Sequence, residues 1–498
     1  MRILNRVLCS TIALTIAGAT AGPLRAQDRT FPHTSSSAKA NHWYELAMKE
    51  REDLLFVDKG IDSMREAVKE DPHFALAHAA LAYFTNDPLE EKRERALAQK
   101  NIANASPDER LLIIWMNGTK DGDLVPAIAA MNDLLAKYPN DERLRNMDGE
   151  WLCSTQGAFE HGESVLKQLL KNDPKYFPAM NNLAYCYALS GQPKLAPELM
   201  EEYVVALPDQ PNPEDSYGEI MRMLGDYQAA LEHYNKALKI DPDFNTSKVG
   251  IASTYALMGE QEKARAQYLV AIDGTKERAT KFDYRILWAM TYYRENQPER
   301  ARQELKKIVV EADRDGLAIE HAEAHRDMAL FNPDAQAALK DMDHARVALL
   351  ARDFAKGDRD NECATILYTR AFIAARAGLK DEVQKSLEPL SAMARTSRSY
   401  IVQRAYHSAK GASLLMQEKY DAAIQELEDD AQNPFSLQLL ANAQNKAGQA
   451  AEAQKTLTTL AAINDERVET AVAVPQARAA LKANPSTTAQ AAPFHIHP

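Results

Sequence analysis

The chain has 498 residues, four cysteines, a formal net charge of −12 and a mean hydropathy of −0.44. An acidic surface repels phosphate backbones, so this charge argues against a nucleic-acid partner. Beyond the N-terminus, no stretch approaches the eighteen or so apolar residues that a transmembrane helix needs.

The N-terminus has the pattern of a secretory signal peptide. Residues 1–26 begin with two arginines, Arg2 and Arg6, followed by an apolar run and then several small residues, an order that is typical of export signals. Cleavage is expected after Ala21 or, as the alternative, after Ala26. We therefore expect an exported bacterial protein that is either periplasmic or secreted.

The centre of the chain carries a repeat of 34 residues, marked by glycines at equal spacing: Gly191, Gly225 and Gly259. A small residue follows each glycine after five positions, and a bulky one follows four positions later. These residues are Ala196, Ala230 and Ala264, then Met200, Tyr234 and Tyr268. Residues four apart share one face of a helix. The pattern predicts a unit of two short helices with a turn at the glycine.

This pattern resembles the tetratricopeptide repeat family, most clearly in the segments NNLAYCYALSGQPKLAPELMEEY and MLGDYQAALEHYNKALKIDP. Fainter copies extend the frame outward, so that about a dozen repeats cover residues 41–482. The resemblance implies an all-α fold, a right-handed superhelical solenoid of helix-turn-helix repeats. Repeats of this kind bury their apolar faces by stacking on their neighbours.

The predicted domains follow from this frame. A polar linker at residues 27–40 is expected to be disordered, and a first repeat array then covers residues 41–355. A second array covers residues 364–482, and residues 483–498 form a disordered tail. The charged stretch AKGDRDNEC between the arrays is interpreted as a longer connection.

The cysteines give no disulfide framework, because three remain once Cys9 leaves with the signal peptide. Cys153 and Cys186 fall on first helices of adjacent repeats, where a small core residue is expected. The less favoured alternative is a disulfide between them.

The sequence contains no motif for a nucleophile, a phosphate loop or a metalloprotease. We therefore expect no enzyme activity, no cofactor, no metal and no small-molecule substrate. The less favoured alternative is a metal-binding or hydrolytic site built from His321, His325 and His344, since the first two lie one helical turn apart. His495 and His497 are interpreted as part of the disordered tail.

The resemblance implies a concave groove lined by the first helix of each repeat. Its inward positions hold aromatic anchors and spaced cations, residue types that dominate binding hot spots. The predicted partner-binding residues are Asn181, Asn182, Tyr185, Arg222, Met290, Tyr293, Arg294, Tyr368, Phe372, Arg376, Asn442 and Lys446. Asn182 matches one position of the family's carboxylate clamp, but the accompanying Lys and Asn are not evident.

The predicted function is that of an exported, non-enzymatic scaffold that binds a peptide or protein segment in this groove. Apolar anchors would supply affinity, and Arg and Lys would fix the register of an acidic segment. The partner would be a protein or peptide, with an envelope complex at the membrane as one setting. The alternative is an assembly component that docks through the solenoid ends.

Overall fold

The computed structural model describes residues 31–32, 35–53 and 57–483. The predicted signal peptide and residues 484–498 of the predicted tail, with His495 and His497, lie outside these ranges. Within them the chain forms 25 α-helices and no strand, which confirms the all-α fold class.

The helices of the first half, in chain order, are α1 Ala38–Met48, α2 Val57–Glu70, α3 Ala75–Phe84, α4 Pro88–Asn101, α5 Pro107–Asp121, α6 Leu124–Lys137, α7 Glu142–Ser154, α8 Phe159–Asn172, α9 Phe177–Leu189, α10 Ala196–Ala206, α11 Pro211–Leu224 and α12 Tyr227–Ile240. The second half comprises α13 Asn245–Met258, α14 Gln261–Gly274, α15 Arg278–Arg294, α16 Pro298–Asp315, α17 Ala318–Leu330, α18 Ala335–Leu350, α19 Lys356–Arg376, α20 Lys380–Thr396, α21 Tyr400–Met416, α22 Tyr420–Glu428, α23 Pro434–Lys446, α24 Ala450–Ala461 and α25 Val468–Ala483. Short segments of other helix types lie at Lys49–Asp53, Ile102–Asn104 and Pro193–Leu195.

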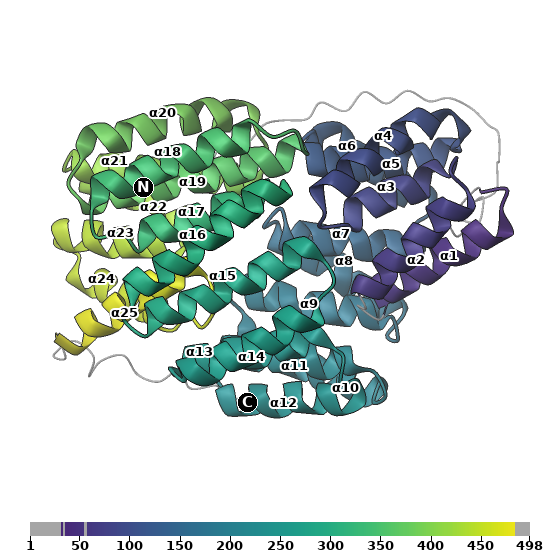
Figure 1. The fold of residues 1–498 in the computed structure, drawn as a ribbon, viewed down its shortest axis with the longest axis horizontal. Coiled ribbons are helices and arrows are strands. Elements are labelled where there is room, and N and C mark those ends of the chain that lie inside the picture. The colour runs from purple at the N-terminus through teal and green to yellow at the C-terminus, as the bar shows by residue number, and fades with distance from the viewer. Residues whose placement is uncertain (1–30, 33–34, 54–56, 484–498) are drawn as a thin grey trace, which may run out of the picture.

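The helices pair into hairpins that stack along the chain (Figure 1). Each odd-numbered helix from α1 to α23 packs against the even-numbered helix that follows it, which gives twelve hairpins within the described residues. The last helix, α25, has no following partner there and packs on α23 and α24. The count agrees with the dozen repeats expected from the sequence.

The turn of each central repeat uses the glycine that marks the sequence period. Gly225 and Gly259 end α11 and α13 with φ of 82° and 87°, a left-handed conformation in which other residues are strained. The small residues that follow, Ala230 and Ala264, are completely buried. The 34-residue frame is therefore confirmed at the level of single residues.

Two turns among the described residues adopt the same conformation without a glycine. Asn296 has a φ of 61° between α15 and α16, and Glu418 has a φ of 63° between α21 and α22. Replacing Glu418 with Gly is expected to raise the free energy of unfolding by about 1 kcal/mol, since it removes left-handed strain. Chemical denaturation measures this change. Glu418→Ala is the matched control, because it keeps the Cβ atom; equal stability of the two variants would contradict the prediction.

Part of the predicted disordered linker is ordered. Helix α1 begins at Ala38, and Ser35 donates a hydrogen bond to Asp71 at 2.5 Å. The backbone N–H of Phe31 donates to Asp141 at 2.8 Å. The polar composition did not reveal these contacts because each of them is made to a residue distant in sequence.

The predicted connection between two arrays is wrong, because residues 356–363 form the first turns of α19. Lys356 and Asp360 pair one turn apart on this helix, and Asp358 pairs with Lys120 of α5 at 3.2 Å. Charged residues that are typical of a loop are here stabilised as helix by ion pairs. The hydrophobic core continues through α18 and α19 without a break.

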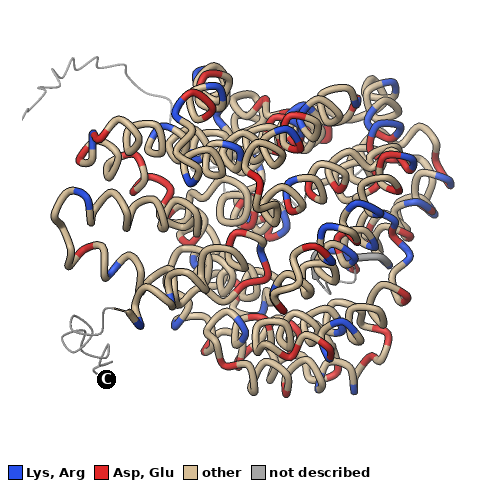
Figure 2. The backbone as a smooth tube through the Cα atoms, turned by 60° about the vertical axis from the view of Figure 1, so that its left-hand side comes forward, with Lys and Arg blue, Asp and Glu red and all other residues tan. Residues whose placement is uncertain are grey.

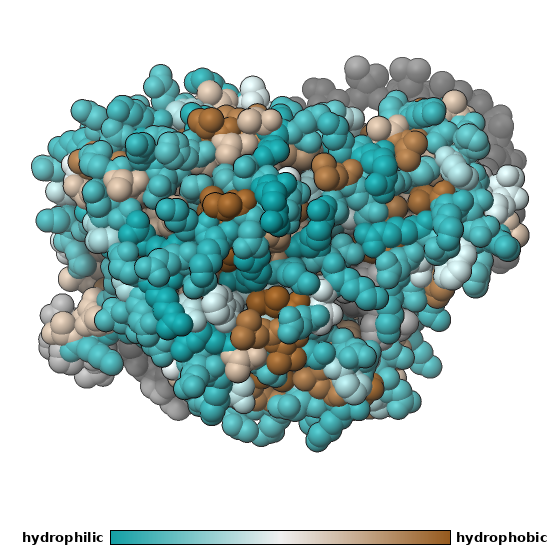
Figure 3. All heavy atoms as spheres, in the orientation of Figure 1, coloured by the Kyte–Doolittle hydropathy of each residue, from teal (hydrophilic) through white to brown (hydrophobic). Residues whose placement is uncertain are grey.

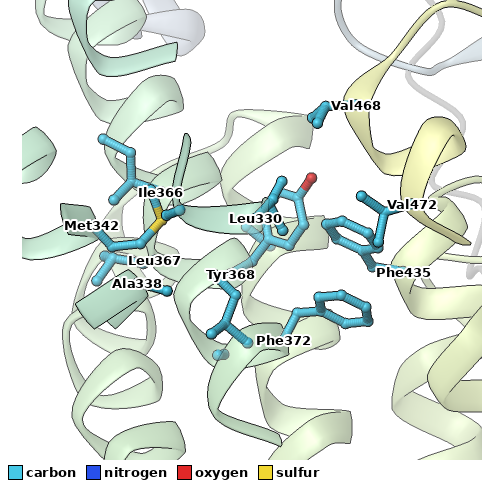
Figure 4. Packing of buried hydrophobic residues seen from close by; sticks show 14 of the residues in the cluster. Leu330, Ala338, Met342, Ile366, Leu367, Tyr368, Phe372, Phe435, Val468 and Val472 are labelled. Carbon is cyan, nitrogen blue, oxygen red and sulfur yellow. The ribbon is translucent and has the colours of Figure 1, made fainter. Parts of the chain in front are cut away.

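The largest hydrophobic core spans α15 to α25. Phe372 of α19 stacks on Phe435 of α23 with ring centroids 3.7 Å apart. Val472 of α25 lies beside the Phe435 ring, and Val468 of the same helix belongs to the same buried cluster (Figure 4). The last helix is thus anchored to the solenoid by apolar packing, which contributes on the order of 1.5–3 kcal/mol for each large side chain buried.

The solenoid turns far enough to bring distant repeats into contact. Lys120 and Asp358 are 238 residues apart in sequence, and Tyr227 contacts Asn464 across 237 residues. This separation equals seven repeats of 34 residues. One superhelical turn therefore takes about seven repeats, and α19 closes over α5 where the turn is complete (Figure 1).

The surface is mostly hydrophilic on the face that Figure 3 shows. An apolar patch lies over α14, where Leu269 and Val270 are about half exposed. Among the described residues, none of the helices combines the length and the apolar composition that a bilayer crossing requires.

Candidate functional site

The closure of the superhelix encloses a cavity of about 310 Å³. Its inner wall comes from the first helices of successive repeats, α3, α5, α7 and α9. Asp358 and Asn361 of α19 form its opposite side. The ion pair between Lys120 and Asp358 joins the two sides. The cavity thus exists because repeats one superhelical turn apart meet here.

Aromatic side chains from three successive repeats line this cavity, which we call the aromatic cavity. The rings of Tyr83 and Trp115 have centroids 5.5 Å apart, and those of Trp115 and Trp151 are 6.2 Å apart. Phe84 adds a further ring, over which the Arg51 guanidinium lies at 5.2 Å. Large rigid rings of this kind supply apolar contact area at low entropic cost.

Three buried donors in the described wall of the aromatic cavity have no hydrogen-bond partner. Among the described lining residues, the buried side-chain atoms without a hydrogen-bond partner are the Nε1 atoms of Trp115 and Trp151 and the Nε atom of Arg51. A buried donor without a partner costs roughly 1–3 kcal/mol. Trp115 and Trp151 are 1% and 4% exposed, so a ligand with carbonyl or carboxylate oxygens reaches these donors only where the cavity wall shifts.

The cavity is also lined by the acidic side chain of Glu150. Glu150 is accessible to water inside the concavity but is surrounded by protein, so desolvation raises the pKa of its carboxyl against the opposing effect of Arg51. Arg51, Lys120 and Asp358 are the other charged residues that line the aromatic cavity.

Of the predicted partner-binding residues, Asn182 lines the aromatic cavity, and its amide donates to Asn146 at 3.0 Å. The predictions missed Tyr83, Trp115 and Trp151, because the predicted inward positions begin only with the repeat of Gly191, although Gly122 and Gly157 continue the turn glycines before it. The spacing of these three aromatic residues, 32 and then 36 residues, is the signal that could have revealed them.

Further along the solenoid, the chain's own residues 463–467, which join α24 to α25, occupy the predicted groove. We call them the groove segment; they form no regular structure. Arg222 pairs with Glu466 of this segment and with Glu219. Arg294 donates to the backbone carbonyl of Glu466 at 3.4 Å. Two predicted partner-binding cations are therefore already engaged within the chain.

The predicted aromatic anchors of the second half are engaged as well. The hydroxyl of Tyr368 donates to Glu469 at 2.5 Å in a buried contact. Phe372 stacks on Phe435, and Tyr293 stacks on Phe331 with centroids 3.8 Å apart. These rings pack between helices, because neighbouring first helices lie close enough to share their inward side chains.

Two other predicted residues are buried. Asn181 is 2% exposed and Met290 is 3% exposed, so neither presents a surface to a partner. Tyr185 is partly buried and donates to Glu219 of the next repeat at 2.9 Å. The inward positions of these repeats thus serve packing between repeats.

The remaining predicted residues are accessible. Arg376, Asn442 and Lys446 are all exposed. Arg376 lies over the ring of Phe372 at 5.5 Å. Because these three side chains are exposed, they can contact a partner, and their role stays a prediction.

The interpretation of the cysteines is wrong, because Cys153 of α7 and Cys186 of α9 form a disulfide with Cα atoms 5.3 Å apart. The two first helices pack side by side, which brings equivalent positions of adjacent repeats together. Gly162 of α8 faces this bridge, and a Cβ atom there would lie 2.3 Å from the Cys153 sulfur. The free cysteine among the described residues, Cys363, is buried.

The histidines suggested for the alternative metal site do not form a ligand set. The rings of His321 and His325 lie 4.8 Å apart, and burial with both neighbouring histidines lowers the pKa of His325 to about 4. Within the described ranges, the three-residue group with ligand atoms within 4.8 Å of one another comes instead from α21, α22 and the turn after it: His407, Glu426 and Asp429. Lys410 pairs with Glu426 at 2.7 Å and supplies a cation there already.

Partly or fully buried carboxylates of α15, α17 and α19 lie near one another, and Figure 2 shows acidic residues along the middle of the molecule. Burial and the neighbouring Glu323 and Glu320 raise the pKa of Asp283 to about 8. Burial also raises the pKa of Glu320 and of Glu362 to about 7. Arg326 pairs with Glu362 at 3.3 Å and offsets part of this negative charge.

Known proteins resemble this chain in its helical repeats. Residues 220–244 match the family model described as the tetratricopeptide repeat. The TPR repeat-containing protein YpiA of Bacillus subtilis (strain 168) is 25% identical over 165 residues, which is 33% of this chain and 39% of that protein. The chain therefore matches less than half the length of this curated relative.

Solved structures of helical repeat proteins are similar at low identity. Yeast Tom70 aligns with a TM-score of 0.45 and 15% identity, covering 82% of this chain and 96% of that one. The APC/C hetero-tetramer Cut9–Hcn1 aligns with a TM-score of 0.40 and 15% identity, covering 83% of this chain and 76% of that one.

Proposed function

This chain is a tetratricopeptide repeat protein, and from this premise we propose that it is a non-enzymatic scaffold that binds a peptide or protein segment on its concave face. The aromatic cavity is the observation that carries this proposal. It combines rings from successive repeats with buried donors that lack partners. Where the cavity wall shifts to expose these donors, the backbone carbonyls of an extended segment are suitable acceptors, and an apolar side chain suits the rings.

We further propose that the protein works outside the cytoplasm, in the periplasm or as a secreted protein. The N-terminal export pattern supports this. The Cys153–Cys186 disulfide supports it independently, since structural disulfides persist mainly in oxidising compartments. An envelope complex at the membrane is a suitable setting for such a scaffold.

The test uses the indole donor of Trp151. Trp151→Phe removes the donor but keeps the ring, and combining it with Asn182→Ala removes a second polar group of the aromatic cavity. We expect this double variant to bind a captured partner's segment at least about tenfold more weakly, because one hydrogen bond in a buried site is worth on the order of 1 kcal/mol or more. Capture from envelope extract, followed by titration of the isolated segment, measures the change.

Trp288→Phe is the matched control, because Trp288 of α15 has the same unpaired indole donor but does not line the aromatic cavity. It should bind like the wild type. Equal binding by the double variant and the wild type would move the contact to the solenoid ends, the alternative docking surface.

A further inference from the structure

The groove segment lies in the solenoid as an extended ligand would. Its five residues are not helical, and they run along α11, α12 and α15 over up to about 17 Å. Asn464 accepts from the Tyr227 hydroxyl at 2.9 Å and donates to the Met223 carbonyl at 3.5 Å. Glu466 pairs with Arg222. One polar side chain and one carboxylate thus fix its position.

The fit of this segment is incomplete. Arg294, which faces it, contacts the Glu466 carbonyl at 3.4 Å rather than a carboxylate. The acidic residue that could reach Arg294, Asp465, turns back to its own segment and accepts from Arg467 at 2.7 Å and from Thr470. Burial lowers the pKa of Arg294 despite the neighbouring acidic groups. A ligand with a second carboxylate at this place would satisfy a cation that the resident segment does not.

The groove segment can leave without unfolding the helices on either side. Helix α24 is held in its hairpin with α23, and α25 is anchored by Val468 and Val472 against the aromatic core (Figure 4). Residues 464–467 contribute polar contacts, and Ile463 packs, partly buried, against the hydrophobic core. The polar part of such a loop opens locally at low free-energy cost.

We propose that the groove lined by Arg222, Tyr227 and Arg294 is a binding site for an extended acidic peptide of a partner protein, and that residues 463–467 are its exchangeable resident occupant. The partner peptide carries two carboxylates, one for Arg222 and one for Arg294. This proposal rests on the proposed function in that the concave face receives extended segments. The site is separate from the aromatic cavity, so an experiment can contradict one of the two binding proposals without contradicting the other.

The test measures binding of a fluorescein-labelled peptide with the sequence of residues 461–470, AAINDERVET, to the full chain. The released variant, Asn464→Ala with Glu466→Ala, removes the side-chain contacts that the resident segment makes with Arg222, Met223 and Tyr227. We expect it to bind the probe at least about tenfold more tightly than the wild type, because apparent affinity rises with the fraction of open sites. Adding Arg222→Gln to the released variant should remove this gain.

Glu452→Ala is the matched control, since it removes the same charge from an exposed position of α24 that pairs with Lys455. It should bind the probe as weakly as the wild type. A released variant that binds no more tightly than the wild type would overturn the proposal, and so would one that dimerises through its own segments instead of binding the probe.

Hydrogen exchange on the unmodified protein gives a second measurement that needs no variant. Saturating probe should speed exchange at residues 463–467 and leave α24 unchanged. Unchanged exchange at these residues would overturn the proposal. Trp151→Phe should bind the probe as the wild type does, because Trp151 lines the aromatic cavity and not this groove. Variants of the aromatic cavity and variants of the groove therefore change the binding of different ligands.

Discussion

Removing the Cys153–Cys186 disulfide is expected to lower the free energy of unfolding by about 3–4 kcal/mol. The bridge closes a sequence separation of 33 residues, and a loop of this size loses entropy of that order when it is cross-linked in the unfolded chain. The effect should centre on α7, α8 and α9, because repeat arrays are stabilised by neighbouring units. Chemical denaturation of Cys153→Ala with Cys186→Ala measures it.

A reductant provides the matching control within the same protein. It should destabilise the wild type by a similar amount and leave the double alanine variant unchanged. Cys363→Ala, which alters a buried cysteine outside the bridge, should leave the response to the reductant intact. A thiol count in denaturant that does not rise by two on reduction would contradict the disulfide.

Replacing Asp283 with Asn is expected to stabilise the protein increasingly as the pH rises. Burial and neighbouring carboxylates raise the pKa of Asp283 to about 8, so the folded state holds a proton that the unfolded state releases near pH 4. The wild type therefore loses stability between these values, by up to about 1.4 kcal/mol per pH unit. The Asn variant carries no such proton and avoids this loss.

The free energy of unfolding of Asp283→Asn, relative to that of the wild type, should rise by about 2–3 kcal/mol between pH 5 and pH 7. Denaturation at a series of pH values measures it. Asp273→Asn is the control, because Asp273 makes the same charge change at an exposed position of α14. A difference between Asp283→Asn and the wild type that stays constant with pH would contradict the buried, protonated carboxyl.

The repeat frame could be predicted because it depends on local rules. Gly225 and Gly259 mark turns that need a left-handed residue, and Ala230 marks the close approach of two helices. Each of these requirements is met within one hairpin. The 34-residue period therefore predicted the helices and the hairpins across most of the chain.

The candidate site could not be predicted in the same way. Asn182, a predicted partner-binding residue, lines the aromatic cavity, but Trp115 and Trp151 lie in earlier repeats, whose inward positions the prediction did not include. Arg222 and Arg294 do face the groove, yet both of them contact Glu466, which is distant in sequence. No local pattern reveals a contact made one superhelical turn away.

The sequence by itself determined the all-α repeat fold, since helix periodicity, turn residues and close-packed alanines are all properties of short segments. The tertiary structure alone decided which inward positions stay accessible. Small rotations between repeats add up to a turn of about seven repeats, and this sum brings α19 over α5 and residues 463–467 into the groove. The disulfide was decided in the same way, because its two cysteines meet through the stacking of neighbouring repeats.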